Sequence, residues 1–134
     1  MQLPHGAIVA VADGEKLNLF RNAGDETAPK LTALPAEPTA NENRGSGARH
    51  HSSSANHQAS QLEEDSFAAG TADLLNKQVL GGAISALVVI AAPRTLGELR
   101  KHYHAKLSDV LIKEISKDLT GHAVHDIEKT ISAA

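Results

Sequence analysis

Cysteine is absent from the 134-residue chain, and aromatic residues are few, with two phenylalanines and one tyrosine. Without cysteine the chain cannot form a disulfide, a thiolate metal site or a cysteine nucleophile. Positive charge is not in excess either, because 13 lysines and arginines face 16 acidic residues and the net charge is -3. This balance argues against a surface that binds nucleic acid over its whole extent, and it leaves room only for a local basic patch.

Long apolar runs are missing as well. The longest uncharged apolar run covers residues 86–93, far fewer than the roughly 20 residues that cross a bilayer. The N-terminus shows neither the basic segment nor the apolar stretch of a secretory signal. We therefore expect a soluble, cytoplasmic protein, and a chain of this length is expected to form a single domain over residues 1–134.

Three short strands are predicted in the first 35 residues, at 6–12, at 16–22 and around Leu31 to Leu34. The first is an apolar run closed by Asp13-Gly14, a pair typical of tight hairpin turns. The third is ended by Pro35, because proline cannot donate to a strand ladder. We expect the first two strands to form a β-hairpin.

The second half of the chain alternates helical and strand patterns. Ser60 with Glu63, and Thr95 with Glu98, resemble capping boxes that would begin helices running to about Gln78 and to about Lys106. Gly81-Gly82 is expected to end the first of these helices. Its sheet-facing side is predicted to carry Phe67, Ala68, Ala72, Leu75 and Val79.

Two more strands and a last helix complete the prediction. The apolar run at 86–92 is typical of a strand buried on both faces. Residues 110–119 fit a strand or a helix extension, and we favour the strand. A last helix after Thr120-Gly121 would bury Val124, Ile127 and Ile131. The order predicts an α/β fold with a mixed β-sheet of about five strands and three helices.

A basic segment lies within a predicted long, mobile loop over residues 35–59. Residues 44–57 contain two arginines, three histidines and no acidic residue. Guanidinium groups flanked by small residues can reach phosphates with little obstruction, whereas the same composition is also typical of a solvated segment without a ligand. The candidate phosphate-binding residues of this segment are Arg44, Gly45, Gly47, Arg49, His50 and His51.

A second set of cations follows the predicted buried strand. Arg94 leaves the carboxyl end of that strand, where open α/β sheets usually bind ligands, and Arg100 and Lys101 follow on the next helix. These three residues are candidates for an anion site. The alternative is that Arg100 simply pairs with a nearby carboxylate on a solvated helix face.

Other polar residues give weaker indications of chemistry. The spacing of His50, His51 and His57 matches no metal-binding motif, and no phosphate-binding or dinucleotide-binding loop is present, so we expect neither a metal nor a cofactor. His122 and His125 could face Asp118 or Asp126 in an acid-base arrangement, but polar residues are also common at helix ends. Asp13 fits a hairpin turn better than a catalytic carboxylate.

Three segments carry a resemblance to a known family: residues 91–100 (AAPRTLGELR), 114–120 (EISKDLT) and 10–14 (AVADG). They resemble the bacterial host-attachment protein family, which is related to the central domain of the archaeal and eukaryotic peptide-chain release factor. The resemblance implies an RNase H-like layer architecture. The Gly-Gly-Gln tip of that release-factor domain is missing here, so hydrolysis of peptidyl-tRNA is not carried over.

The favoured interpretation is therefore a non-catalytic domain that binds RNA or the ribosome through its basic loop. A second hypothesis, implied by the family name, is a factor for attachment to host cells that acts indirectly or at the cell surface. A third is a hydrolase or nuclease. The sequence predicts no oligomeric state.

Overall fold

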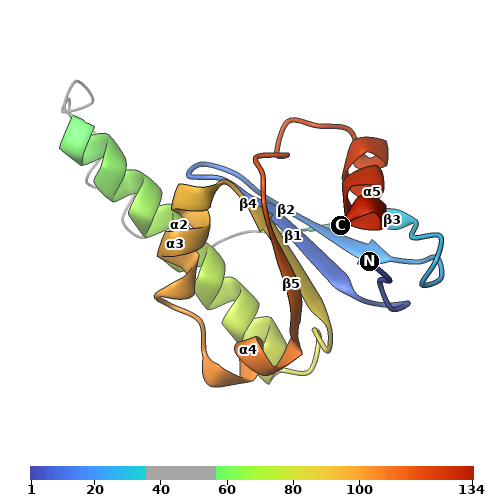
Figure 1. Ribbon diagram of the computed structural model, residues 1–134. Helices are drawn as coiled ribbons and strands as arrows, with labels where there is room; N and C mark the ends of the chain where they lie inside the picture. The colour runs from blue at the N-terminus through green and yellow to red at the C-terminus, as the bar shows by residue number, and fades with distance from the viewer. Residues whose placement is uncertain (36–56) are drawn as a thin grey trace.

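Five strands form one mixed sheet in the computed structural model, which describes residues 1–35 and 57–134 (Figure 1). The strands are β1 (Ile8–Ala12), β2 (Leu17–Asn22), β3 (Leu31–Leu34), β4 (Leu87–Ala91) and β5 (Leu111–Ser116). The helices among the described residues are α2 (His57–Leu80), α3 (Pro93–Arg100), α4 (Ala105–Val110) and α5 (Val124–Ala133). The predicted α/β fold with a mixed five-stranded sheet is confirmed.

The strands lie in the order β3-β2-β1-β4-β5. β1 pairs antiparallel with β2 and parallel with β4, and β4 pairs parallel with β5. β3 is antiparallel to β2 and so runs in the same direction as β1. Four of the five strands therefore end at the same edge of the sheet.

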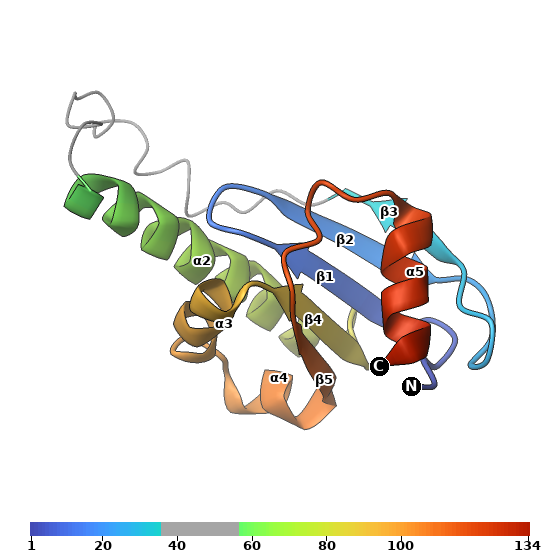
Figure 2. The same cartoon turned by 45° about the horizontal axis from the view of Figure 1, so that its top comes forward.

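Helices cover both faces of this sheet (Figure 2). α2, α3 and α4 pack on one face, where Leu75, Leu87 and Leu99 are fully buried. α5 lies across the other face and buries Ile127 and Ile131 against the sheet. The strands in the middle carry apolar side chains toward both layers, so every residue of β1 and β4 is buried.

Most of the predicted elements are present. The first two strands form the expected hairpin, and the short third strand joins its outer side. Residues 110–119 contain a strand, as favoured, and the predicted face of α2 packs on the sheet. Gly82 has a φ of +86°, and with Gly81 it ends α2 as predicted.

The start of α2 was predicted wrongly. The helix begins at His57 and runs through Ser60, so Ser60 cannot be its N-cap and Glu63 does not lie in its first turn. Gln58 and Ala59 are strong helix formers that extend the helix at its N-terminal end. The last three residues of the predicted loop are therefore helical, and residues 36–56 lie outside the described part of the chain.

The second predicted helix is two helices in the structure, which raises the number among the described residues from three to four. α3 begins at Pro93, with Ala92 as N-cap and no side-chain cap, so the Thr95-Glu98 capping box is not formed. α3 ends at Arg100 rather than near Lys106. The side chain of Asn76 on α2 makes two hydrogen bonds here. Its Nδ2 donates to the His102 carbonyl at 2.8 Å, and its Oδ1 accepts from the His104 backbone amide at 2.9 Å.

This contact with α2 fixes an extended backbone at His104, where a new helix starts. The His104 ring nitrogen Nδ1 accepts a hydrogen bond from the Lys106 amide at 3.0 Å and caps α4. The break between α3 and α4 therefore depends on a residue 26 to 28 positions away in the sequence, which local capping patterns do not reveal.

Candidate functional site at the carboxyl edge of the sheet

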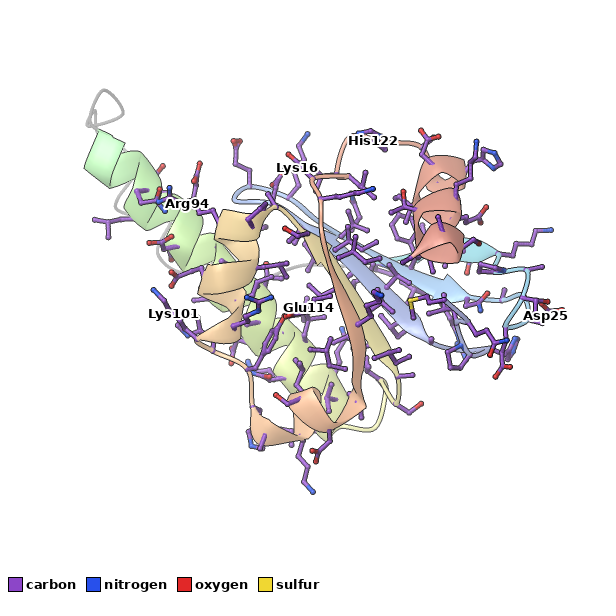
Figure 3. All side chains as sticks on the ribbon, viewed as in Figure 1. Lys16, Asp25, Arg94, Lys101, Glu114 and His122 are labelled. Carbon is purple, nitrogen blue, oxygen red and sulfur yellow. The ribbon has the colours of Figure 1, made fainter. Side chains whose placement is uncertain are left out.

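Four chain segments meet at the edge where β1, β3, β4 and β5 end, which we call the carboxyl edge. They are the β1–β2 turn, the residue after β3, the start of α3, and the loop between β5 and α5. Ligands of open α/β sheets usually bind outside such an edge. In Figure 3, Lys16, Arg94 and His122 lie along the upper part of the molecule, where these strands end.

Asp13 holds the β1–β2 turn in place. Its Oδ1 atom accepts hydrogen bonds from the amides of Glu15 and Lys16 at 2.7 and 2.6 Å. Burial raises the pKa of Asp13, but these two amides and the Thr120 hydroxyl together outweigh burial and hold that pKa below its ordinary value. Asp13 therefore has the structural role in a hairpin turn that its Asp-Gly sequence favours.

Gly14 allows this turn to lie against α2. A Cβ atom at Gly14 would come within 2.6 Å of Cγ and 2.9 Å of Cβ of Glu64. Real side chains do not approach so closely, and these atoms are near the helix backbone and cannot move far. The hairpin turn and the N-terminal half of α2 are thus in direct contact.

Thr120 ties the loop after β5 to the same turn. Its hydroxyl oxygen lies 2.8 Å from Asp13 Oδ2 and 2.9 Å from Asp118 Oδ1. One hydroxyl proton can be donated to only one of the two carboxylates at a time. The Asn18 side chain adds a longer hydrogen bond, at 3.4 Å, to the Thr120 carbonyl. Two segments of the carboxyl edge are therefore fastened to each other.

Arg94 is an exposed cation at this edge. Pro93 occupies the first helical position of α3, where its missing N–H costs nothing, and Arg94 follows directly. Among residues 1–35 and 61–134, no hydrogen bond or ion pair joins the Arg94 side chain to another residue. Its guanidinium group offers five donors in a planar fork that suits phosphate.

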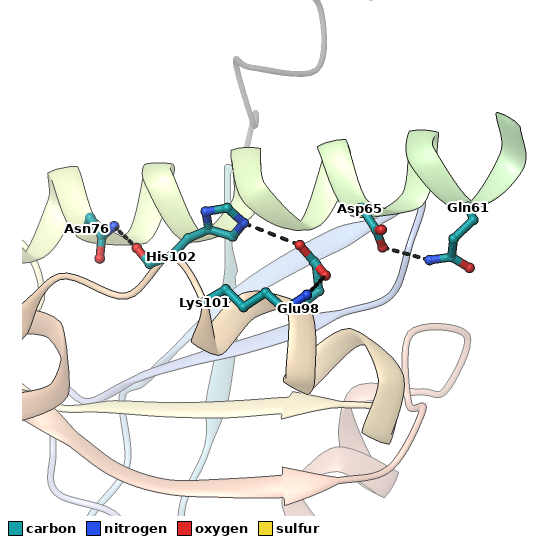
Figure 4. Close-up of polar contacts among 6 residues, drawn as sticks. All are labelled: Gln61, Asp65, Asn76, Glu98, Lys101 and His102. Carbon is teal, nitrogen blue, oxygen red and sulfur yellow. Dashed lines mark hydrogen bonds and ion pairs between the residues drawn. The ribbon is translucent and has the colours of Figure 1, made fainter. Parts of the chain in front are cut away.

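Arg100 and Lys101, the other two predicted cations, are held by carboxylates. Arg100 places Nε and Nη2 at 2.9 and 2.7 Å from Glu114 Oε1 on β5, as in the alternative interpretation of this residue. Lys101 Nζ lies 3.0 Å from Glu98 Oε1 (Figure 4). The Lys101 contact lowers the pKa of Glu98, with a smaller contribution from His102. Arg94 is the member of this set best placed to bind an external anion.

The remaining candidates have separate partners. His122 Nδ1 lies 3.9 Å from Asp126 Oδ2 on an exposed surface, whereas Asp118 Oδ1 accepts from the backbone amide of Thr120 at 3.3 Å. Within the described residues, no three histidine or acidic side chains form a group that could hold a metal ion. The candidate residues Arg44, Gly45, Gly47, Arg49, His50 and His51 lie outside the described ranges.

Lys16 was not among the residues selected from the sequence. It is exposed in the β1–β2 turn, at the same edge as Arg94. The sequence did contain this information. The turn of a predicted hairpin follows the carboxyl end of its first strand, and a parallel neighbour of that strand ends at the same edge of the sheet. The contacts of Glu114 and Thr120 had no such signal, since each joins residues far apart in the chain.

Comparison with known proteins gives one family match. The model of the family described as bacterial archaeo-eukaryotic release factor family 12 matches residues 6–131, which is nearly the whole chain. No curated protein matches the chain. The match covers all five strands and the carboxyl edge, so the site described above lies within the shared region.

Proposed function

Because the chain belongs to the bacterial archaeo-eukaryotic release factor family 12, we propose that it is a non-catalytic domain that binds RNA, with the ribosome as its partner. The five-stranded α/β fold agrees with a release-factor-like domain. The contact surface in this proposal is the carboxyl edge of the sheet. The observation that carries it is the exposed Arg94 at that edge.

The position of the basic segment in the chain supports this surface. β3 ends at Leu34 on the carboxyl edge, and α2 begins at His57. The residues between them include Arg44 and Arg49, with no acidic residue from 44 to 57. Phosphate contacts by such cations give RNA affinity without reading its sequence. Lys16 and Arg94 extend the positive surface onto the folded body.

The carboxylates at this edge do not support a hydrolase. Asp13 accepts hydrogen bonds from two backbone amides and the Thr120 hydroxyl, so its carboxylate oxygens are already used in contacts that stabilise the fold. His122 approaches Asp126 and not Asp118. A general base must lie within hydrogen-bond reach of the group it deprotonates and of the residue that orients it. The contacts of Asp118 and His122 do not form such a chain.

Attachment to host cells stays a prediction of the sequence resemblance. None of the helices in the described parts of the chain combines the length and apolar character needed to cross a membrane. Cell fractionation tests this hypothesis directly, because a direct adhesive role requires most of the protein to be found on the outer surface. The observations at the carboxyl edge favour RNA binding, and the experiment below addresses that proposal.

Co-sedimentation with ribosomes tests the proposed function. The wild type is compared with an Arg44→Ala, Arg49→Ala double variant at low and moderate salt. The matched control is Arg21→Ala, Lys30→Ala, which removes two exposed cations near the opposite edge of the sheet. We expect the first variant to lose association while the control keeps it. Equal, negligible association of all three proteins would refute the proposal.

A further inference from the structure

Within residues 1–35 and 57–134, no strand pairs with the outer edge of β5. β5 is the last strand of the sheet, and among the described strands it pairs only with β4. Alternate N–H and C=O groups of a terminal strand point away from its single neighbour and are free to pair with another chain. β5 is six residues long, which is enough to accept a full strand.

The opposite edge of the sheet differs. β3 has only four residues and is followed by Pro35. The amide of Leu31, its first residue, is already used, because it donates to Glu128 Oε2 on α5 at 2.8 Å. A short strand with an occupied donor is a poor template for strand addition. β5 therefore offers the better docking edge of the two.

An extra residue in β5 decides which side chains face which layer. Leu111 pairs with Leu87 and Lys113 with Val88, so Ile112 is inserted as a bulge and is 41% exposed. Beyond the bulge, Glu114 faces α3, where it binds Arg100. Lys113 and Ile115 therefore face the side of α5.

A groove of about 310 Å³ runs between β5 and α5. Buried Ile115 contributes to its lining, and Lys113 and Lys117 are its exposed basic residues. Glu114 also lines the groove, but its carboxylate is paired with Arg100, and the residues that α5 and the end of the chain contribute are Thr130, Ala133 and Ala134. The groove thus combines an apolar contact, one lysine of β5, one lysine directly after β5, and the outer strand edge beside them.

Lys113 argues against a second copy of this chain as the occupant. In an antiparallel pairing of β5 with itself centred on Lys113, Lys113 of each copy would lie directly opposite Lys113 of the other. Like charges directly opposite each other on one face of a strand pair are destabilising. The same arrangement attracts a strand that presents acidic side chains at alternate positions.

We propose that β5 binds an extended acidic peptide segment of another protein as a sixth strand of the sheet. The backbone of the peptide pairs with the open edge, and its acidic side chains face Lys113 and Lys117. Small apolar side chains of the peptide contact Ile115. This interaction is separate from the carboxyl-edge contact with RNA, because it uses the length of β5 and the groove beside α5.

The probe is a fluorescein-labelled peptide in which glutamate alternates with valine, and binding is followed by fluorescence anisotropy. We expect the Lys113→Glu, Lys117→Glu variant to bind it about tenfold more weakly than the wild type. The matched control, Lys106→Glu, Lys129→Glu, changes the net charge equally at two exposed lysines elsewhere and should bind as the wild type does. Backbone amide resonances of β5 should shift on binding.

A second probe separates strand addition from simple charge attraction. The same peptide with its backbone nitrogens methylated at alternate residues keeps its charge but cannot pair with a strand edge. We expect this peptide to lose binding to the wild type. Retained binding, absence of binding by the unmodified peptide, or an effect of the control variant equal to that of Lys113→Glu, Lys117→Glu would each overturn the proposal. Equal binding of a short oligouridylate that depends on the same two lysines would instead assign the groove to nucleic acid.

Discussion

The hydroxyl of Thr120 donates to Oδ2 of Asp13 at 2.8 Å, although the two residues are 107 positions apart in the chain. Asp13 begins the β1–β2 turn and Thr120 lies in the loop after β5, so this contact joins two separate segments of the carboxyl edge. The turn also carries Lys16, an exposed cation of the proposed RNA contact. The contact therefore helps to hold the proposed binding surface in one arrangement.

Replacing Thr120 by valine should destabilise the protein. The substitution keeps the side-chain shape but removes the hydrogen bond to the Asp13 carboxylate, which is worth about 1 kcal/mol at a partly buried position. Urea unfolding measures the free energy of unfolding. Thr120→Ser keeps the hydroxyl and should lie closer to the wild type than Thr120→Val, and the account of this contact is wrong if the two variants are equally stable.

The contribution of Asp13 to stability should depend on pH. Burial raises its pKa, but the hydrogen bonds from Glu15, Thr120 and Lys16 outweigh burial, so its folded pKa lies below its ordinary value. A carboxylate whose pKa is depressed by folding stabilises the fold above its unfolded pKa, and that contribution is lost as pH falls through the folded pKa. The wild type should therefore exceed Asp13→Asn in stability at about pH 6 more than at about pH 3. A stability difference that stays constant over this range would contradict the assignment.

Two glycines should respond to alanine with opposite signs. Gly14→Ala would bring a methyl group within 2.6 Å of Glu64 Cγ, and overpacking of this kind costs about 1–3 kcal/mol. Gly97 lies within α3 with no atom within 4 Å of its added Cβ, so Gly97→Ala should stabilise the helix by about 0.5–1 kcal/mol. Thermal unfolding of both variants measures the two effects. If Gly14→Ala and Gly97→Ala destabilise the protein equally, α2 does not press on the hairpin turn.

Tyr103 should titrate at unusually high pH. Burial, together with the charge and hydrogen bond of Glu114, raises the pKa of its phenol. Because the folded pKa is above the unfolded value of about 10, the stability that the neutral phenol supplies is present below that pH and is lost as pH rises above it. Tyr103→Phe should therefore lose less stability than the wild type between about pH 10 and 12.

Ultraviolet absorbance provides the direct measurement, since Tyr103 is the only tyrosine in the chain. Glu114→Gln should lower the pKa of Tyr103 toward its ordinary value, because it removes a nearby negative charge. Glu15→Gln removes an exposed charge from the hairpin turn and should leave the tyrosine titration unchanged. Identical titrations of the wild type and Glu114→Gln would exclude the contact between Tyr103 and Glu114.

Elements defined by local chemistry could be predicted from the sequence. The apolar run before Asp13-Gly14 predicts the hairpin, because the turn residues and strand pattern agree. The run at 86–92 predicts a strand covered on both sides, and β4 is buried throughout. These predictions need only residues close together in the chain, where propensity and periodicity act.

Features set by distant residues could not be predicted in this way. Asn76 on α2 separates α3 from α4 by binding the backbone at His102 and His104. The partner of Arg100 is a glutamate on β5, and the partner of Asp13 is Thr120. The sequence indicates that such side chains need partners, but it does not show which partners the fold brings near.

Equilibrium binding to ribosomes over a range of salt concentrations tests the central claim most directly. Each phosphate contact contributes about 0.7 to 0.9 to the slope of log affinity against log salt. We therefore expect Arg94→Ala to bind more weakly than the wild type with a shallower slope, and Arg21→Ala, at the opposite edge, to match the wild type. Affinity and slope that are the same for Arg94→Ala and the wild type would contradict binding through the carboxyl edge.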